Sequence, residues 1–494
     1  MSTVPFKVVP SNLRLPGAFF ELDNSQANTA QANQRALIIG QITSAGIATP
    51  NVPIISGGTG DANTQGGASS MLANMLATYR LNDTFGEVWY LPLADAVGAT
   101  AATGSIAFTG VPTANGTISL YVAGQVVTVP VTAAETTTAI ATAVSAAINA
   151  IATMPVTASV ATSTVTLTAD NKGLCGNEID IRFNYYGTAG GEATPAGLTY
   201  TVTAMSGGAT NPTLTAALGN LGNMTFDFIA NPYTDTASLD AVKQFLNDQT
   251  GRWSYQQQLY GHSFGSYAGT FASQTTLGLA RNNQHETVLG FYGSPTPSWL
   301  WTAALCAQVA VSVRADPGVP LQYLPLTGVL APPNQSQFLS NQRETLLYDG
   351  ISTFTVMSDG TVQTENIITT YQTNAQGVAD DSYLEVETMF QIVLEIRTLL
   401  AMLTSKYARC KLADNGTRPA AGSNLVTPNT IAADIRAQYA ERNDAGFVQN
   451  VDEFNAALIV QRNTVNPNRL DILWPIVPVN QMRTFATLVQ FRLQ

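Results

Sequence analysis

Five consecutive residues, Gly261-His262-Ser263-Phe264-Gly265, fit the G-x-S-x-G pattern that surrounds the nucleophile of many serine hydrolases. In those enzymes the serine lies on a sharp turn between a strand and a helix, and an acid and then a histidine follow it along the chain. Of the two histidines here, only His285 follows the motif, and no Asp or Glu lies between Ser263 and His285. We therefore predict a strand end and a loop that leads to a helix at residue 270. A serine hydrolase using Ser263 is kept as an alternative.

Other residues that could do chemistry lack the spacing it requires. The Gly-rich stretch 56–67 does not end in the G-K-[ST] that cradles phosphates, and it is predicted to be a flexible loop. Two histidines and three scattered cysteines show no zinc-binding spacing, so we expect no metal site and no cofactor. The acidic pairs Asp380-Asp381 and Glu385/Glu387 are interpreted as charges at a helix N-terminus. A two-carboxylate glycosidase is compatible with such spacing, but no other feature favours one. We therefore predict that the protein is not an enzyme.

The composition points to a surface that is polar but nearly uncharged. Charged side chains make up only 11% of the 494 residues, and the net charge is −11. Low charge of this kind is typical of proteins that pack against copies of themselves, although an ordinary soluble protein with unusual composition fits as well. Because phosphate binding needs a basic surface, the acidic balance argues against nucleic acid as a direct partner.

Targeting signals and membrane spans are not expected. The first residues lack the charged-then-apolar pattern of a signal peptide, and the apolar stretch 299–313 is too short to cross a bilayer and contains Gln308. Cys175, Cys306 and Cys410 are an odd number with no C-x-x-C, which indicates a reducing compartment. We therefore expect a protein that is made in a cytoplasm and is not inserted into a membrane.

Strands and helices alternate over residues 36–97 and 212–349, which predicts an α/β core domain. The predicted strands and helices lie at 35–42, 69–81, 87–94, 225–233, 238–251, 270–283, 286–292 and 297–315.

Residues 98–211 differ from both flanks. They contain seven charged residues and no Trp, and their apolar residues alternate with a period of two. Ala123-Gly124 is a hairpin signal, and one helix is expected at 134–153. The prediction is an inserted, mostly β domain, and the alternative is a continuation of the α/β core.

A C-terminal domain is predicted over residues 350–469. Ser382-x-x-Glu385 reads as a capping box that opens a long helix at 383–412, and a second helix is expected at 431–443. Two strands, 470–479 and 484–494, are predicted to close the chain.

The two ends of the chain pose a physical problem. The last six residues alternate apolar and polar, and the Pro-punctuated arm 1–35 also contains strand-like runs. A lone strand leaves its backbone groups unpaired, so it must find a sheet. The terminal strand pairs either within its own subunit or with the sheet of a neighbour by strand addition.

Several segments closely resemble one family. They are VPFKVVPSNLRLPGAFFELDNSQAN, NQRALIIGQI, NKGLCGNEIDIRFNYYG, FDFIANPYTD, GRWSYQQQLYGHSFGSYAGT and LDILWPIVPVNQMRTFATLVQFRL. Together they resemble the contractile tail sheath protein of Mu-like bacteriophages along nearly the whole chain, with 98–211 the weakest part.

The resemblance implies a structural protein. Six-subunit rings would stack around an inner tail tube, and contraction would drive the tube through the host envelope for genome delivery. The implied partners are other copies of the chain, the tail tube protein, and the baseplate and tail terminator proteins. The implied location is the virion tail, after assembly in the host cytoplasm. A sheath of a contractile particle without a genome is the alternative.

The resemblance also assigns roles to segments. The arms, about 1–35 and 470–494, would donate strands that complete a neighbour's C-terminal α/β domain, while 98–211 would face outward. The residues that would form these links are Phe19, Phe20 and Leu22 in one arm and Val489, Phe491 and Leu493 in the other.

A basic cluster lies near the end of the long predicted helix. Its members are Lys406, Arg409, Lys411 and Arg418, with Arg436 and Arg442 on the next helix. One interpretation is complementarity to the helix dipole and a solvated surface. The other is contact with an acidic tail tube, since sheaths of this family meet the tube through the C-terminal domain.

Overall fold

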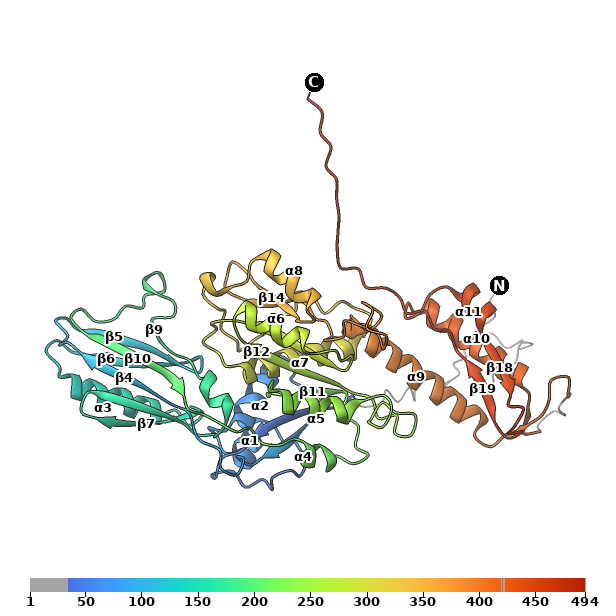
Figure 1. Cartoon of the computed structure of the whole chain (residues 1–494), viewed down its shortest axis with the longest axis horizontal. Coiled ribbons are helices and arrows are strands. Elements are labelled where there is room, and N and C mark those ends of the chain that lie inside the picture. Colours follow the sequence, from blue (N-terminus) through green and yellow to red (C-terminus); the bar gives the residue numbers. More distant parts are fainter. Residues whose placement is uncertain (1–33, 419, 421–422, 494) are drawn as a thin grey trace, which may run out of the picture.

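The computed structural model describes residues 34–418, 420 and 423–493. It shows a large body, a set of antiparallel strands at one end, and a smaller lobe at the other end (Figure 1). The predicted links at Phe19, Phe20 and Leu22 lie outside the described residues.

The body is built on a six-stranded sheet with the strand order β13-β12-β11-β1-β3-β2. All neighbours run parallel except the edge strand β2, as the alternation of strands and helices predicted. The strands are β1 Ala36–Gln41, β2 Ile54–Ile55, β3 Val88–Leu93, β11 Phe228–Ala230, β12 His262–Ala268 and β13 Glu286–Phe291. Such a sheet needs helices on its faces to cover its apolar strands.

Helices α2 and α7 pack against each other and against the sheet. Helix α7 is buried over most of its length, and Trp301 in it stacks on Phe291 of β13 with ring centroids 4.4 Å apart. The helices of the body are α1 Thr59–Gly66, α2 Met71–Asn82, α4 Thr215–Gly219, α5 Thr236–Leu246, α6 Phe271–Leu279, α7 Ser298–Ala315 and α8 Ser340–Tyr348.

The prediction of a loop at 56–67 was wrong, because α1 lies within this stretch. Asp61 explains the helix despite its glycines: its carboxylate accepts hydrogen bonds from the Gly57 amide at 2.9 Å and from the Tyr90 hydroxyl at 3.0 Å. The side chain of Asp61 thus ties the first turn to the sheet.

The stretch 98–211 folds into two antiparallel sheets and one helix. The strand orders are β10-β4-β8-β7 and β6-β5-β9, and α3 packs against β6 and β7. At the predicted hairpin, Ala123 and Gly124 have φ of 51° and 80°, the left-handed geometry that a two-residue turn requires. The elements are β4 Thr103–Thr109, β5 Gly116–Val122, β6 Gln125–Val131, α3 Thr137–Asn149, β7 Val156–Ala161, β8 Thr164–Ala169, β9 Ile181–Phe183 and β10 Thr199–Ser206.

The remaining elements follow α8. They are β14 Thr353–Val356, β15 Val362–Asn366, α9 Val386–Tyr407, β16 Lys411–Leu412, β17 Leu425–Val426, α10 Pro428–Asp444, α11 Val451–Ala457, β18 Ile459–Arg462 and β19 Leu470–Leu473. β14 follows Ser352, which bridges to Leu289 of β13, and β19 pairs with β18. The domain boundaries at 349/350 and 469/470 stay predictions.

The predicted capping box at Ser382 and Glu385 was wrong. Helix α9 begins at Val386 with Glu385 as its N-cap residue and no side-chain cap. Glu385 instead forms an antiparallel backbone β-bridge with Ile368. The preceding turn therefore belongs to the body and not to the helix.

Candidate assembly site in the C-terminal lobe and arm

The C-terminal lobe consists of the second half of α9 together with α10, α11 and β16 to β19. It has its own small core, in which Tyr439 and Phe454 stack with ring centroids 3.6 Å apart. Leu399, Met402 and Leu403 of α9 pack against this core. The lobe is therefore a separate apolar unit with one helix leading into it.

Helix α9 joins the lobe to the body without a break (Figure 1). Val386 and Phe390 in its first half belong to the body core, where Phe390 stacks on Phe228 of β11 with ring centroids 5.1 Å apart. Midway along the helix, Arg397 forms an ion pair with the buried Asp227 at 2.7 Å. Burial raises the pKa of Asp227, and the Arg397 charge opposes that rise.

Beyond β19 the chain returns from the lobe to the start of α9. The backbone amide of Gln449 donates to the Val477 carbonyl at 2.9 Å, and the side-chain amide of Gln391 in α9 donates to the Val479 carbonyl at 3.1 Å. Arg483 then lies between Glu385 and Glu387, with ion pairs of 2.6 and 2.8 Å. Burial raises the pKa of both carboxyls, and Arg483 opposes the rise.

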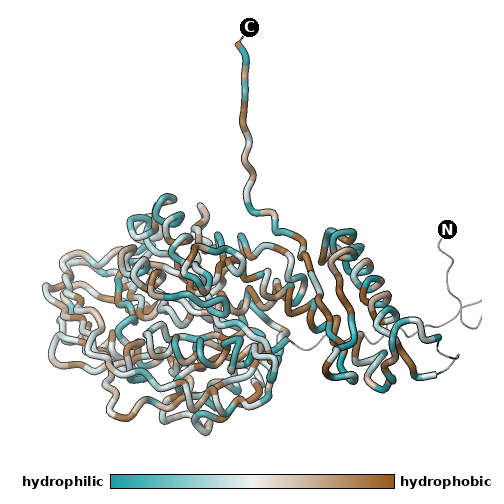
Figure 2. The backbone as a smooth tube through the Cα atoms, turned by 45° about the vertical axis from the view of Figure 1, so that its right-hand side comes forward, coloured by the Kyte–Doolittle hydropathy of each residue, from teal (hydrophilic) through white to brown (hydrophobic). Residues whose placement is uncertain are grey.

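After Arg483 the chain leaves the protein surface. The terminal arm, Thr484 to Leu493, is extended and points away from body and lobe (Figure 1). Its colours alternate between hydrophobic and hydrophilic in Figure 2. Val489, Phe491 and Leu493 are 79, 80 and 88% exposed.

The prediction of a strand at 484–494 is not met within one subunit. Thr484 to Leu493 have no strand partner in the described part of the chain. The alternative that the terminal strand pairs within its own subunit is therefore wrong for the described residues. Thr484 to Leu493 are all exposed, and the end of the chain runs away from body and lobe (Figure 1).

The residues of the predicted basic cluster differ in their ion-pair partners and in their exposure. Lys406 pairs with Asp434 at 3.0 Å, and Arg442 pairs with the buried Glu395 and lies 3.8 Å above the ring of Phe447. The hydrogen bond from Tyr407 and the charge of Lys406 lower the pKa of Asp434. Lys406 is exposed despite its ion pair, and four other members of the predicted cluster are exposed on the lobe, namely Arg409, Lys411, Arg418 and Arg436.

The serine motif does not form a nucleophile elbow. His262 to Ala268 are an inner strand of the six-stranded sheet, buried over most of its length, so the predicted strand end and loop at the motif were wrong. The Ser263 amide donates to the His285 carbonyl at 2.9 Å, and the ring of His262 is within 2.8 Å of the Thr287 hydroxyl. Because neighbours in a strand face opposite ways, Ser263 and His262 cannot act as nucleophile and base.

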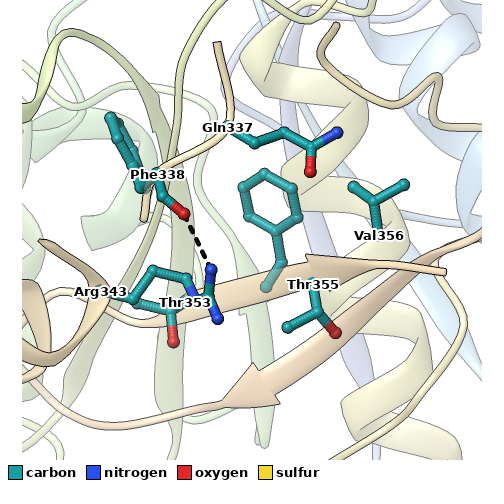
Figure 3. A pocket seen from close by; sticks show the side chains of 8 residues that line it. Gln337, Phe338, Arg343, Thr353, Thr355 and Val356 are labelled. Carbon is teal, nitrogen blue, oxygen red and sulfur yellow. Dashed lines mark hydrogen bonds between the residues drawn. The ribbon is translucent and has the colours of Figure 1, made fainter. Parts of the chain in front are cut away.

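A small cavity of about 150 Å³ is lined by β14, by Arg343 of α8 with Gln337 and Phe338 before it, and by Gly290 of β13 (Figure 3). Arg343 in its wall donates to the Phe338 carbonyl at 2.8 Å and pairs with Glu365 at 2.7 Å, so its charge is compensated. None of the residues predicted for assembly lines this cavity. No group of acidic, histidine or cysteine side chains in the described ranges could hold a metal ion. No described helix is long and apolar enough to cross a membrane.

Relatives of known kind match almost the whole chain. The chain is 37% identical over 492 residues to the Mu-like prophage FluMu tail sheath protein of Haemophilus influenzae, covering 99% of both chains. Residues 207–370 match the model of the phage tail sheath protein central domain, and 378–492 match that of the phage tail sheath C-terminal domain. The chain belongs to the phage tail sheath family. It is a structural subunit of a contractile tail, and the resemblance stated from the sequence is confirmed.

Two solved structures are similar to this chain. A chain of the anti-feeding prophage baseplate superposes with a TM-score of 0.50 at 12% identity, covering 97% of this chain and 100% of that one. A sheath tail protein from Desulfitobacterium hafniense has a TM-score of 0.47 at 14% identity, covering 94% and 97%. The predicted fold class, mixed helices and sheets with a sheath architecture, is confirmed; the exchanged strands stay a prediction.

Sequence reasoning missed the residues at the root of the arm. Glu385 and Glu387 were interpreted as helix-dipole charges, and Arg483 received no role. The available signal was an arginine directly before the predicted terminal strand 484–494.

Proposed function

We propose that this sheath subunit polymerises as stacked six-membered rings around an inner tail tube, and that contraction drives the tube through the host envelope to deliver a genome. The observation that carries the proposal is the terminal arm. Its backbone groups lack partners in the described chain, and Val489, Phe491 and Leu493 stand in solvent. An extended segment of this kind gains most by adding to another subunit's sheet.

The acceptor is the small sheet of the C-terminal lobe. β18 and β19 pair only with each other among the described strands, so both outer edges of this sheet are open. A two-stranded sheet is marginally stable alone, and added strands stabilise it. Strands from Val489, Phe491 and Leu493 of one neighbour and from Phe19, Phe20 and Leu22 of another would complete it.

The tube contact uses the exposed cations of the lobe. Arg409, Lys411 and Arg436 present positive charge to an acidic tube surface. Arg442 was predicted for the same contact, but its charge is engaged by the buried Glu395, and we assign it a structural role. Lys406 pairs with Asp434 on the surface and is 53% exposed, so it stays in the proposed contact.

The other partners in the proposal are the baseplate and tail terminator proteins at the two ends of the sheath, with no direct nucleic-acid contact and no membrane insertion. The subunit would assemble in the host cytoplasm, act in the virion tail, carry no cofactor and catalyse no reaction. A sheath of a particle without a genome would use the same subunit contacts, so sequencing nucleic acid from purified particles distinguishes the two.

The test is removal of residues 487–494. Monomers should stay folded by circular dichroism, and tubes should no longer form by negative-stain electron microscopy. A Val489→Ser, Phe491→Ser, Leu493→Ser variant should behave in the same way, while the matched control Thr487→Ala, Gln490→Ala should polymerise. Tubes of the truncated protein would show that arm donation is wrong.

A further inference from the structure

The position of Arg483 stands out against its neighbours in the chain. Its side chain is 16% exposed, whereas Met482 directly before it and Phe485 two residues after it are 66 and 80% exposed. One side chain is thus drawn into the protein within an otherwise exposed run. Ten residues follow it in the described chain, Thr484 to Leu493.

The contacts of Arg483 come from two elements of the body. It donates to the Asn366 side chain at the end of β15 at 2.6 Å, and it pairs with Glu385 and Glu387 at the start of α9. Glu387 is fully buried, and its other oxygen accepts a hydrogen bond from the Leu321 amide. Removing one partner of a buried ion pair leaves an uncompensated charge, so this contact is costly to break.

Resting on the proposed strand donation, we infer that Arg483 is the anchor that fixes the origin of the terminal arm on the body of its own subunit. Along the sequence, the arm follows the strands of the lobe, whose core is small. In space, the arm leaves the protein from the body. A pull on the donated strand is therefore carried first by Glu385, Glu387 and Asn366, and only then by the contacts of Val479 and Val477 and by β19.

The anchor also sets the reach of the arm. At about 3.3 Å per residue, ten extended residues span roughly 33 Å, so the acceptor edge of the neighbour must begin within that distance of Arg483. A fixed origin reduces the entropy lost when the arm docks, which favours binding without any added contact. Arg483 is thus a positioning residue: the binding itself belongs to the residues beyond it.

The first experiment uses the free, full-length subunit and trypsin. Trypsin cuts after arginine, and Arg492 is exposed while Arg483 is held. Release of the peptide Thr484–Arg492, followed by mass spectrometry, should be slow in the native protein. It should become about tenfold faster in Glu385→Gln, Glu387→Gln, because local opening governs cleavage. Asp471→Asn, which removes the surface partner of Arg469, is the matched control and should change nothing.

The second experiment measures polymerisation. Arg483→Met should raise the concentration needed for tube formation about tenfold with the melting temperature within a few degrees of native, and Arg483→Lys should restore part of the loss, since lysine keeps the charge but not the fork. Should Arg483→Met fail to fold, the trypsin result on the glutamine variants decides. Unchanged peptide release in those variants would overturn the anchor. Polymerisation of the chain lacking 487–494 would instead overturn strand donation and leave the trypsin result to judge the anchor.

Discussion

Arg442 and Lys411 show how basic residues divide into structural and surface roles. Arg442 was grouped with Lys411 as a cation for the tail tube, but its guanidinium pairs with Glu395, which is 4% exposed, and covers the ring of Phe447. Lys411 is exposed on β16. Arg442 and Lys411 differ in whether an acidic partner is buried beside them. The type of the basic residue alone does not reveal this difference.

Arg442→Met should therefore destabilise the protein by about 3–5 kcal/mol, since Glu395 would keep a buried charge without its partner. Lys411→Met should change stability by less than about 0.5 kcal/mol. Urea denaturation followed by circular dichroism measures both. Equal stability of the two variants would mean that the Glu395 pair contributes nothing.

Glu178 links stability to pH. It accepts hydrogen bonds from the amide and hydroxyl of Ser298 at the start of α7, and burial raises its pKa from 4.5 to about 7. Between those pH values the folded protein holds a proton that the unfolded chain has released. Stability contributed by this group therefore falls as the pH rises from about 4.5 to about 7.

Glu178→Gln keeps an oxygen for Ser298 and removes the proton. The variant should have a higher melting temperature than the native protein above pH 7 and a flatter dependence between pH 4.5 and 7. Scanning calorimetry across this range measures the difference, with Glu441→Gln at an exposed position as control. A native-like slope in the Glu178 variant would contradict the assignment.

At the scale of elements, α9 decides how lobe and body are coupled. Thr398 lies in the helix just after Arg397, and its carbonyl accepts a hydrogen bond from Gln438 of α10 at 3.1 Å. Proline here would remove a helical hydrogen bond and clash with the preceding turn, at about 3 kcal/mol or more.

Thr398→Pro should loosen the lobe while the body keeps its cooperative unfolding. Small-angle scattering should show a larger radius of gyration, and amide exchange should speed up in α10 but not in β1. Thr398→Ala is the control and should match the native protein. Loss of protection throughout the body would show that the two cores do not open separately.

The elements that the sequence predicted well are those with a strong local pattern. The buried strand at 36–41 falls within the range expected from its periodicity, and the helix at 71–82 ends one residue beyond its expected range. The hairpin at Ala123-Gly124 followed from turn chemistry. The misses depend on contacts between distant residues: α1 needs Tyr90 of β3, and the buried strand of the serine motif needs a neighbour on each side.

The candidate site was predictable only in part for the same reason. The alternation of Val489, Phe491 and Leu493 is a local pattern that the sequence shows directly, and the three side chains are exposed in the structure; their role in strand exchange stays a prediction. The partners of Arg483 lie about 100 residues earlier in the chain, and no local pattern connects them. The periodicity of a segment shows which of its side chains must be buried, whereas only the fold shows which distant residues they contact.

At the scale of the whole molecule, low charge has a measurable consequence. The proposed links between subunits are backbone hydrogen bonds and apolar side chains, and the net charge of −11 makes copies repel one another weakly. Raising salt from about 0.1 to about 1 M shortens the screening length from about 10 to about 3 Å.

Tube formation by the subunit alone should thus be unchanged or slightly favoured at high salt, measured by pelleting and electron microscopy. Binding of the sheath to a purified acidic tail tube through Arg409, Lys411 and Arg436 should weaken over the same range. Tubes that dissolve at about 1 M salt would indicate links made by ion pairs and would contradict the apolar strand model.

The unbroken α9 makes the subunit a lever. Its 22 residues span about 33 Å, and both ends are embedded in a packed core. A tilt of about 10° at the lobe therefore displaces the far end of the helix by about 6 Å, with no joint in between to absorb it. In a polymer, small rotations at the linked lobes would produce large sideways displacements of the bodies. A change in the length of the polymer would therefore be coupled to a change in its diameter.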